Sequence, residues 1–267
     1  MYDFHFSKAR SIDEAVDLKK FEDTEFLAGG QTLIPTLKQR MANPTRLVSI
    51  IDIPGIKGIT ARGKKKISIG AATTHEEVFR EAIVFQGLSD LAGRIGDPAV
   101  RNRGTIGGSI ANNDPSACYP AAALASGAHI VTNLREILAD DFFKGMFETA
   151  LKMDEIITEI KFPIPLKANY QKFEQPASRF ALVGVFLAVF DKSVRVAVTG
   201  ASVNGVFRWF EAEKVLKRNF VPEMLDALTF SNQDEFIDDM HGTAEYRSNL
   251  IKVLTKRAVL VCENQSN

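Results

Sequence analysis

Glycines and hydroxyl residues gather in one short stretch of the chain, and their types suit the binding of an anion. Residues 103–115 read Arg-Gly-Thr-Ile-Gly-Gly-Ser-Ile-Ala-Asn-Asn-Asp-Pro, with glycines at 104, 107 and 108. Glycine lets a ligand approach bare backbone N–H groups, and N–H groups near a helix start attract phosphate. A plain tight turn between a strand and a helix explains the stretch equally well, because glycine-rich loops are weakly specific.

Asp114 and Pro115 predict the start of the next helix, over residues 117–125. Aspartate is favoured at the N-cap and proline at the first helical position. Capping is therefore the simpler role for Asp114, with contact to a ligand as the alternative. Cys118, inside that predicted helix, is expected to be a small buried side chain rather than a nucleophile.

A second strand–glycine–helix unit lies nearer the N-terminus. Residues 25–28 predict a short buried strand, residues 29–32 read Gly-Gly-Gln-Thr, and Pro35 is placed to begin a helix that runs to about Met41. The loops at 28–32 and 105–109 would each present free backbone N–H groups. Together they could grip two linked phosphates.

Composition excludes several classes of function. Lys plus Arg and Asp plus Glu both number 33 in 267 residues, so the chain lacks the basic field that nucleic-acid binding needs. The two cysteines are far apart and the four histidines show no ligand spacing, which argues against a metal or iron–sulfur site. No apolar run reaches the ~18 residues of a membrane span, and no signal peptide is indicated, so we expect a cytoplasmic protein.

The remaining pattern predicts an α+β chain with boundaries near residues 55 and 165. A hairpin is expected over 59–69, and Thr74 with Glu77 forms a capping-box pattern at a helix start. A strand is expected over 155–162 and a hairpin over 180–203. Apolar residues at helical spacing predict a closing helix over 246–262.

The two glycine loops together resemble the FAD diphosphate loops of one family, the medium, flavin-carrying subunits of molybdenum hydroxylases. This family includes the medium subunit of carbon monoxide dehydrogenase and the FAD subunit of xanthine dehydrogenase. The resemblance rests on Ala-Gly-Gly-Gln-Thr-Leu-Ile-Pro at 28–35 and Thr-Ile-Gly-Gly-Ser at 105–109. Flanking segments at 69–75, 100–104, 155–160 and 242–247 also fit, so it extends over nearly the whole chain.

The resemblance implies the FAD-binding fold of the vanillyl-alcohol-oxidase and p-cresol-methylhydroxylase type. Two α+β subdomains, 1–55 and 56–165, would hold FAD, and 166–267 would form a smaller C-terminal α+β domain of the carbon monoxide dehydrogenase flavoprotein type. The implied cofactor contacts are Ala28, Gly29, Gly30, Gln31, Thr32, Leu33, Ile34, Ile95, Thr105, Ile106, Gly107, Gly108, Ser109, Asp114, Cys118, Ile157, Glu174 and Phe180.

Three features depart from the family pattern. Cys118 stands where many relatives have an aspartate that contacts the cofactor. Glu174 stands where relatives often have a lysine or arginine near the flavin ring, and Arg179 could replace that charge. The inserted cysteines that hold an extra iron–sulfur cluster in one branch of the family are missing, so FAD would be the only redox centre.

The implied function is electron transfer. A [2Fe–2S] small subunit would deliver electrons to FAD from a molybdopterin-binding large subunit, and an external acceptor would remove them. The complex would be a dimer of heterotrimers, with FAD bound non-covalently. Two alternatives stay open: a stand-alone flavin oxidase of the same fold, and a non-catalytic docking subunit that has lost FAD.

Overall fold

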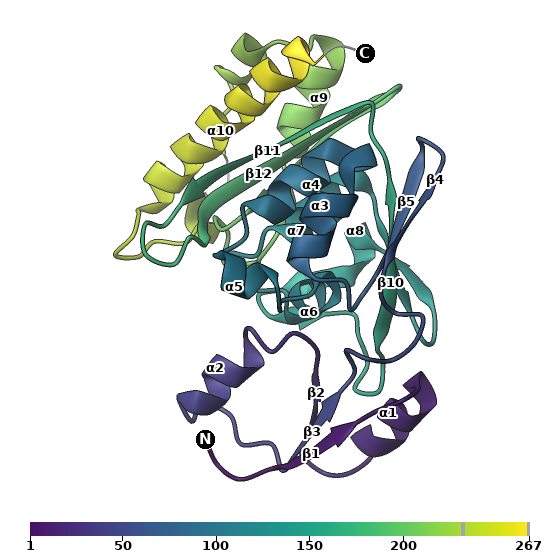
Figure 1. Ribbon diagram of the computed structural model, residues 1–267. Coiled ribbons are helices and arrows are strands. Elements are labelled where there is room, and N and C mark those ends of the chain that lie inside the picture. Colours follow the sequence, from purple (N-terminus) through teal and green to yellow (C-terminus); the bar gives the residue numbers. More distant parts are fainter. Residues whose placement is uncertain (231–232, 266–267) are drawn as a thin grey trace.

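Three sheets with flanking helices form the framework of the computed structural model, which describes residues 1–230 and 233–265 (Figure 1). The first sheet lies in a small N-terminal lobe, set apart from the larger body that contains the other two. Its strands are parallel, in the order β1 (His5–Lys8), β3 (Arg46–Ser49) and β2 (Thr24–Leu27). Helices α1 (Ile12–Lys19) and α2 (Leu33–Lys38) connect them.

The second sheet is antiparallel and has the order β4-β5-β10-β6-β7. Its strands are β4 (Ile59–Arg62), β5 (Lys66–Gly70), β10 (Ile157–Pro163), β6 (His129–Thr132) and β7 (Glu136–Leu138). A separate two-stranded sheet consists of β8 (Phe143–Gly145) and β9 (Glu148–Thr149). The predicted hairpin over 59–69 is confirmed as β4 and β5.

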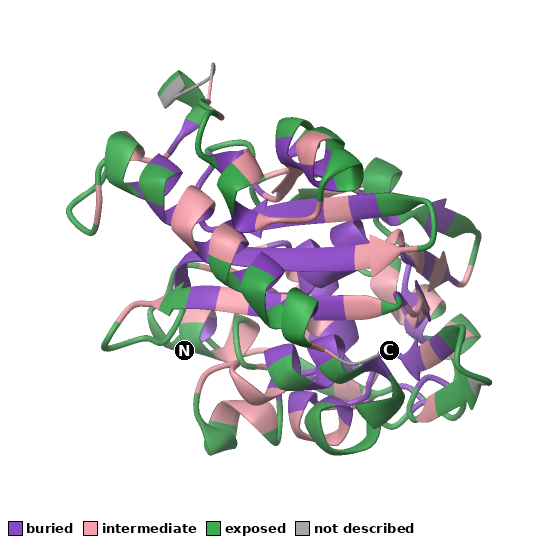
Figure 2. Cartoon of the chain, turned by 90° about the horizontal axis from the view of Figure 1, so that it is seen from above, coloured by how far each residue is buried: buried purple, intermediate pink, exposed green. Residues whose placement is uncertain are grey.

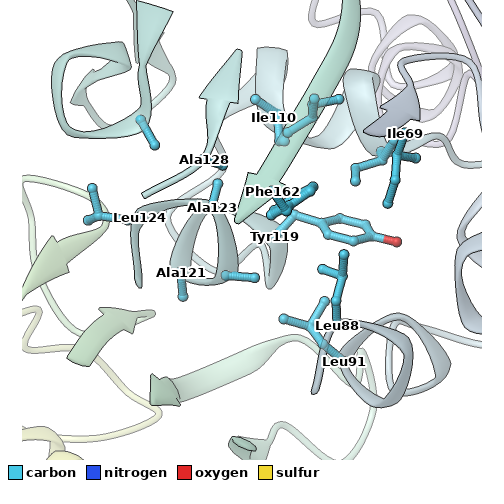
Figure 3. Close-up of a cluster of buried hydrophobic side chains, with 14 of the residues drawn as sticks. Ile69, Leu88, Leu91, Ile110, Tyr119, Ala121, Ala123, Leu124, Ala128 and Phe162 are labelled. Atoms are coloured by element: carbon cyan, nitrogen blue, oxygen red, sulfur yellow. The ribbon is translucent and has the colours of Figure 1, made fainter. Parts of the chain in front are cut away.

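Six helices of the central region accompany the second sheet, namely α3 (His75–Glu81), α4 (Gln86–Gly93), α5 (Pro98–Arg101), α6 (Ile106–Asn112), α7 (Tyr119–Ser126) and α8 (Ala139–Phe142). A 3-10 turn, η1 (Ile83–Phe85), precedes α4. The predicted capping box is confirmed at α3, where Thr74 Oγ1 accepts from Glu77 N and Glu77 Oε2 accepts from Thr74 N. Leu88 and Leu91 of α4, Tyr119 of α7 and Phe162 of β10 meet in the buried core (Figure 3).

The third sheet has both faces covered. It is antiparallel, with β11 (Lys167–Glu174), β12 (Ala181–Phe190), β13 (Ser193–Thr199) and β14 (Phe207–Arg208) in that order. Helices α9 (Phe210–Arg218) and α10 (Ala244–Asn264) pack on one face, and short 3-10 turns, η2 (Pro222–Leu225) and η3 (Gln233–Glu235), lie between them in sequence. Figure 2 shows the buried strands beneath the more exposed helix surface. The predicted hairpin and closing helix are both confirmed.

Alternate residues of β12 serve two different cores, as the two-residue period of a strand requires. Phe186 and Ala188 belong to the central core with α4 and α7. Val185 and Leu187 belong to a second core under α9 and α10. This double burial explains why β12 is an almost continuous apolar run.

The predicted start of the helix after Asp114 is wrong. Helix α7 begins at Tyr119 with Cys118 at its N-cap, and its early proline is Pro120 rather than Pro115. Thr199 Oγ1 and Gly200 N both donate to the carbonyl of Pro115, at 2.7 Å each. Residues 115–117 are therefore held by the end of β13 and cannot join the helix.

The two glycine loops also differ from the prediction. Gly107 and Gly108 lie in the first turn of α6, which begins at Ile106 with Thr105 as N-cap. Helix α2 begins at Leu33 rather than at Pro35 and ends at Lys38. Both loops are thus shorter than predicted, because each helix begins within the motif itself.

Candidate functional site

One cavity of about 650 Å³ lies between the N-terminal lobe and the larger body. Its walls contain residues of all three sheets or their connections. Of the predicted contact residues, it gathers Ala28, Gly29, Gly30, Gln31, Thr32, Leu33, Ile95, Thr105, Gly107, Gly108, Ser109, Asp114, Cys118, Ile157 and Phe180. A volume of this order is typical of small-molecule and cofactor sites.

Three predicted contact residues do not line this cavity. Ile106 is fully buried in the central core. Ile34 follows the first loop inside α2, where its side chain lies against Gly30. Glu174 turns to Arg94, whose Nε lies 3.6 Å from Glu174 Oε1.

The first glycine loop retains unpaired backbone donors. No described residue accepts a hydrogen bond from the backbone N–H groups of residues 29–33. Gly30 has φ of +70°, a conformation that glycine adopts readily. These residues all line the cavity. An anion with several acceptor oxygens would satisfy this row of donors.

In the second loop the N–H groups of residues 106–109 are paired, contrary to the prediction, and Thr105 N alone in this loop lacks an acceptor among the described residues. Ile106 N donates to Thr73 O, Gly107 N donates to Ala71 O at 2.9 Å, and Gly108 N donates to the capping Thr105 Oγ1 at 3.2 Å. The bonds from Ile106 and Gly107 attach the start of α6 to residues 71–73, which directly follow β5. The loop therefore contributes a rigid surface to the cavity.

The two glycines of this second loop have different roles. A Cβ on Gly107 would lie 2.5 Å from Ala71 Cβ, so this glycine allows α6 to pack on its neighbour. A Cβ on Gly108 would meet Thr105 Oγ1 at 2.9 Å and point towards Ala28, whose Cβ is 3.8 Å away. Gly108 therefore opens the space between the two loops.

The loops touch each other through backbone atoms. A Cβ built on Gly29 would lie 2.0 Å from the carbonyl oxygen of Arg103 and 2.7 Å from Gly104 Cα. Any side chain at position 29 would push the N-terminal lobe away from the second loop. This contact fixes the separation of the two cavity walls.

His75 lines the cavity and was missed as a site residue by the sequence patterns. It is 5% exposed, its backbone N donates to Gly104 O, and its ring packs 5.3 Å from the ring of Tyr119. Nδ1 has no hydrogen-bond partner among the described residues. A Cβ on Gly104 would lie 2.5 Å from Nε2, so Gly104 leaves room for this ring beneath the second loop.

We expect His75 to make the protein less stable below neutral pH. Burial, and secondarily the charge of Arg101, lower the pKa of His75 from 6.5 to about 4. Between pH 6.5 and pH 4, His75 binds a proton in the unfolded chain but not in the folded one. The free energy of unfolding therefore decreases by about 3 kcal/mol in total as the pH is lowered through this range. The urea concentration at the unfolding midpoint of wild type should be lower at pH 4.5 than at pH 7. This difference should be smaller in His75→Gln.

The matched control for this measurement is His5→Gln, since His5 is exposed on β1. This variant should keep the full wild-type pH dependence. An equal pH dependence in wild type and His75→Gln would contradict the role assigned to His75.

Charged groups in the cavity wall are mostly paired. Burial raises the pKa of Asp114, whose carboxylate accepts from Ser116 N at 2.8 Å. Hydrogen bonds from Arg135, together with those from Lys152 N and Thr132, lower the pKa of Glu155 to about 2. Both carboxyl groups are held by fixed donors, and neither is paired with a second group as an acid–base couple.

Cys118, a departure from the family pattern, and Arg179, the suggested replacement for the charge missing at Glu174, both line the cavity. Cys118 is 6% exposed and lies in the cavity wall at the start of α7. Arg179, proposed as a replacement charge, also lines the cavity, but it is exposed and its backbone is left-handed, with φ of +58°.

The cavity has the properties needed for FAD. Unpaired N–H groups at residues 29–33 and the opening at Gly108 suit a diphosphate. Apolar side chains such as Ile95, Ile157 and Phe180 suit the faces of aromatic rings. No helix of the described residues is long and apolar enough to cross a membrane.

Comparison with known proteins gives consistent matches. The family described as "FAD binding domain in molybdopterin dehydrogenase" matches residues 2–165. The nicotine 6-hydroxylase medium subunit of Paenarthrobacter nicotinovorans is 34% identical over 96% of this chain and 95% of its own length. The carbon monoxide dehydrogenase medium chain of Hydrogenophaga pseudoflava is 32% identical over 96% of both chains.

Solved structures agree with these matches. A chain of reconstituted CO dehydrogenase from Oligotropha carboxidovorans superposes with a TM-score of 0.88, at 30% identity and with 99% of each chain covered. This similarity confirms the fold that the two loops predicted.

Proposed function

Because this chain belongs to the family of FAD-binding domains found in molybdopterin dehydrogenases, we propose that it is the electron-output subunit of such a complex. The family makes it an FAD-carrying oxidoreductase subunit. We propose that a molybdopterin-binding large subunit produces the electrons, that a [2Fe–2S] subunit delivers them, and that an external acceptor removes them. The proposed assembly is a dimer of heterotrimers.

One observation supports this function best: the unpaired N–H groups of residues 29–33 face a cavity shared with the Gly108 surface. FAD, when bound there, supplies the electron storage. Residues 29–33 would bind its diphosphate, and Gly108 would let the diphosphate approach the backbone. Ile95, Ile157 and Phe180 would shield its rings from water. The residues inferred from the resemblance remain predictions as direct contacts, as does the division at residues 55 and 165.

The described charged groups of the cavity wall support electron transfer over a stand-alone oxidase, because they form no acid–base pair. Asp114 and Glu155 line the cavity, but backbone and arginine donors hold them. His75 is confined between Gly104 and Tyr119. No two of these described groups are hydrogen-bonded to each other as a general acid and base.

Affinity purification of the tagged chain from its native host tests this proposal. We expect a flavin spectrum with one FAD per chain, together with two further subunits that contain molybdopterin and [2Fe–2S] centres. FAD without the other subunits, and with substrate oxidation by this chain alone, would favour the stand-alone oxidase. Partner subunits without any flavin absorbance would favour the docking protein.

We also predict that FAD is held without a covalent bond. Neither glycine loop contains a histidine or cysteine. Precipitation of the purified protein with trichloroacetic acid should therefore leave all yellow colour in the supernatant. Colour that stays in the pellet would contradict this prediction, and mass spectrometry of peptides containing His75 and Cys118, the two such residues in the cavity wall, would then locate the link.

A further inference from the structure

Lys172 is a buried cation in the cavity wall without a carboxylate partner. It lies on β11, is 7% exposed and is one of the residues that line the cavity. Its Nζ donates to the carbonyl oxygen of Arg94 at 2.9 Å. No carboxylate among the described residues forms an ion pair with it. A buried ammonium group carries three donors and is costly unless they are satisfied.

The neighbouring Arg94 explains why Lys172 remains unpaired. Arg94 donates to the carbonyl oxygens of Tyr170 and Lys172 at 3.1 and 3.2 Å, and its Nε lies 3.6 Å from Glu174 Oε1. The carboxylate of this region is therefore directed at Arg94. The two remaining N–H groups of Lys172 are left for an acceptor in the cavity.

The other cations of the cavity wall do not share this property. Lys19 donates to Thr24 O and lies 3.4 Å from Glu25 Oε2. Lys152 and Arg179 are exposed to solvent. Water screens exposed charges strongly, so their effect on a ligand is weak compared with that of a buried charge.

From this arrangement we propose that Lys172 provides the positive charge that stabilises the reduced flavin ring. This inference rests on the proposed FAD site. Adding two electrons and one proton to FAD leaves one negative charge on its ring system, and a nearby buried cation favours that charge. Glu174, at the position where the family resemblance often implies a lysine or arginine, is a carboxylate here and faces Arg94. Lys172, two residues earlier on the same strand, takes over the charge.

The diphosphate is the other part of FAD that could accept from Lys172. Its charge does not change when the ring is reduced, so the two possibilities predict different results. The unpaired N–H groups that suit a diphosphate are on the N-terminal lobe, whereas Lys172 is on the third sheet. We therefore assign Lys172 to the ring.

The test is to measure FAD affinity and the two-electron midpoint potential of Lys172→Met, which keeps a similar volume without charge. We expect oxidised FAD to bind within about threefold of wild type. Reduced FAD should bind about tenfold more weakly, which is a fall of about 30 mV in the midpoint. Lys172→Arg should recover most of the difference.

Lys167→Met is the matched control, because Lys167 lies on the same strand but does not line the cavity. Its midpoint should equal that of wild type. Equal weakening of both redox forms in Lys172→Met would place the contact at the diphosphate and overturn the proposal. An unchanged midpoint would also overturn the proposal, even if the variant is less stable. That result is expected if Lys172 only stabilises the fold through its hydrogen bond to Arg94.

The proposed function can fail separately. If wild type contains and binds no FAD, the proposed function is wrong and this inference falls with it. If every variant binds FAD and only the midpoint fails to respond, the inference alone is wrong.

Discussion

Replacing Gly29 with alanine should abolish tight FAD binding. The added Cβ would lie 2.0 Å from the carbonyl oxygen of Arg103, far inside van der Waals contact. The φ angle of Gly29 is not in the left-handed region, so alanine suits the backbone and only the missing space forbids it. The two loops must separate by more than 1 Å, and a shift of that size costs a large part of the binding energy of a positioned ligand.

We expect the FAD dissociation constant of Gly29→Ala to rise at least about a hundredfold, which corresponds to about 3 kcal/mol. Titration of apo-protein, followed by quenching of FAD fluorescence, measures it. Circular dichroism and the urea midpoint should change little, because Gly29 belongs to none of the hydrophobic cores.

Gly145→Ala is the matched control for this experiment. A Cβ at Gly145 would lie 3.6 Å from Glu148 Oε2, an ordinary contact, and its φ angle is likewise unstrained. This variant should bind FAD as wild type does. Wild-type affinity in Gly29→Ala would show that contact between the loops is not needed to hold the cofactor.

Replacing Glu155 with glutamine should give the largest loss of stability among the charged residues of the cavity wall. Its side chain is 0% exposed and accepts from Arg135 Nε at 2.9 Å and from Arg135 Nη2 at 3.0 Å. Thr132 Oγ1 and Lys152 N donate to the same carboxylate. The amide of glutamine cannot accept all four bonds. We expect a loss of about 2–3 kcal/mol, reduced because Arg135 can reach water.

The pH dependence of Glu155 provides a second measurement. Its pKa is lowered from 4.5 in the unfolded chain to about 2 in the folded one. A lowered acid pKa contributes stability that is fully present above pH 4.5 and is lost as pH falls towards 2. Wild type should therefore lose stability across this window, and Glu155→Gln should lose less. The His75 effect lies mainly above it, between pH 6.5 and 4.

Glu136→Gln is the control for the Glu155 variant. Glu136 is 42% exposed in its side chain and pairs with Lys161 at 2.6 Å. Surface pairs of this kind contribute about 0–1 kcal/mol. Similar losses in the two variants would show that burial of Glu155 has no special effect.

The fold could be predicted largely from local patterns. Glycine loops beside short strands, the Thr74 capping box and the apolar run of β12 each specify structure within a few residues. The start of α7 could not be predicted, because it depends on Thr199 and Gly200 holding Pro115 across more than 80 positions of sequence. The preference of Asp114 for a helix N-cap position is therefore overridden by that long-range contact.

The candidate site likewise has features that local sequence patterns predict and features that depend on long-range contacts. The glycine loops were identified from residue types, and the structure places both in one cavity. Their N–H groups could not be assigned from sequence, because the partners of Ile106 and Gly107 lie on a different element, at Thr73 and Ala71. His75 and Lys172 were missed for a related reason. A single histidine or lysine carries no pattern, and only the packed structure shows that each is buried beside the cavity.

Strand β12 limits where this protein can be truncated or fused to other proteins. Phe186 packs against Phe85 on one side, with ring centroids 6.1 Å apart, while Val185 packs under α10 on the other. A fragment truncated after residue 165 would keep both glycine loops yet lack one wall of its own core. The C-terminal region is therefore needed to complete the core beside the cofactor site, so gene fusions, shortened forms and evolutionary rearrangements should keep the two together.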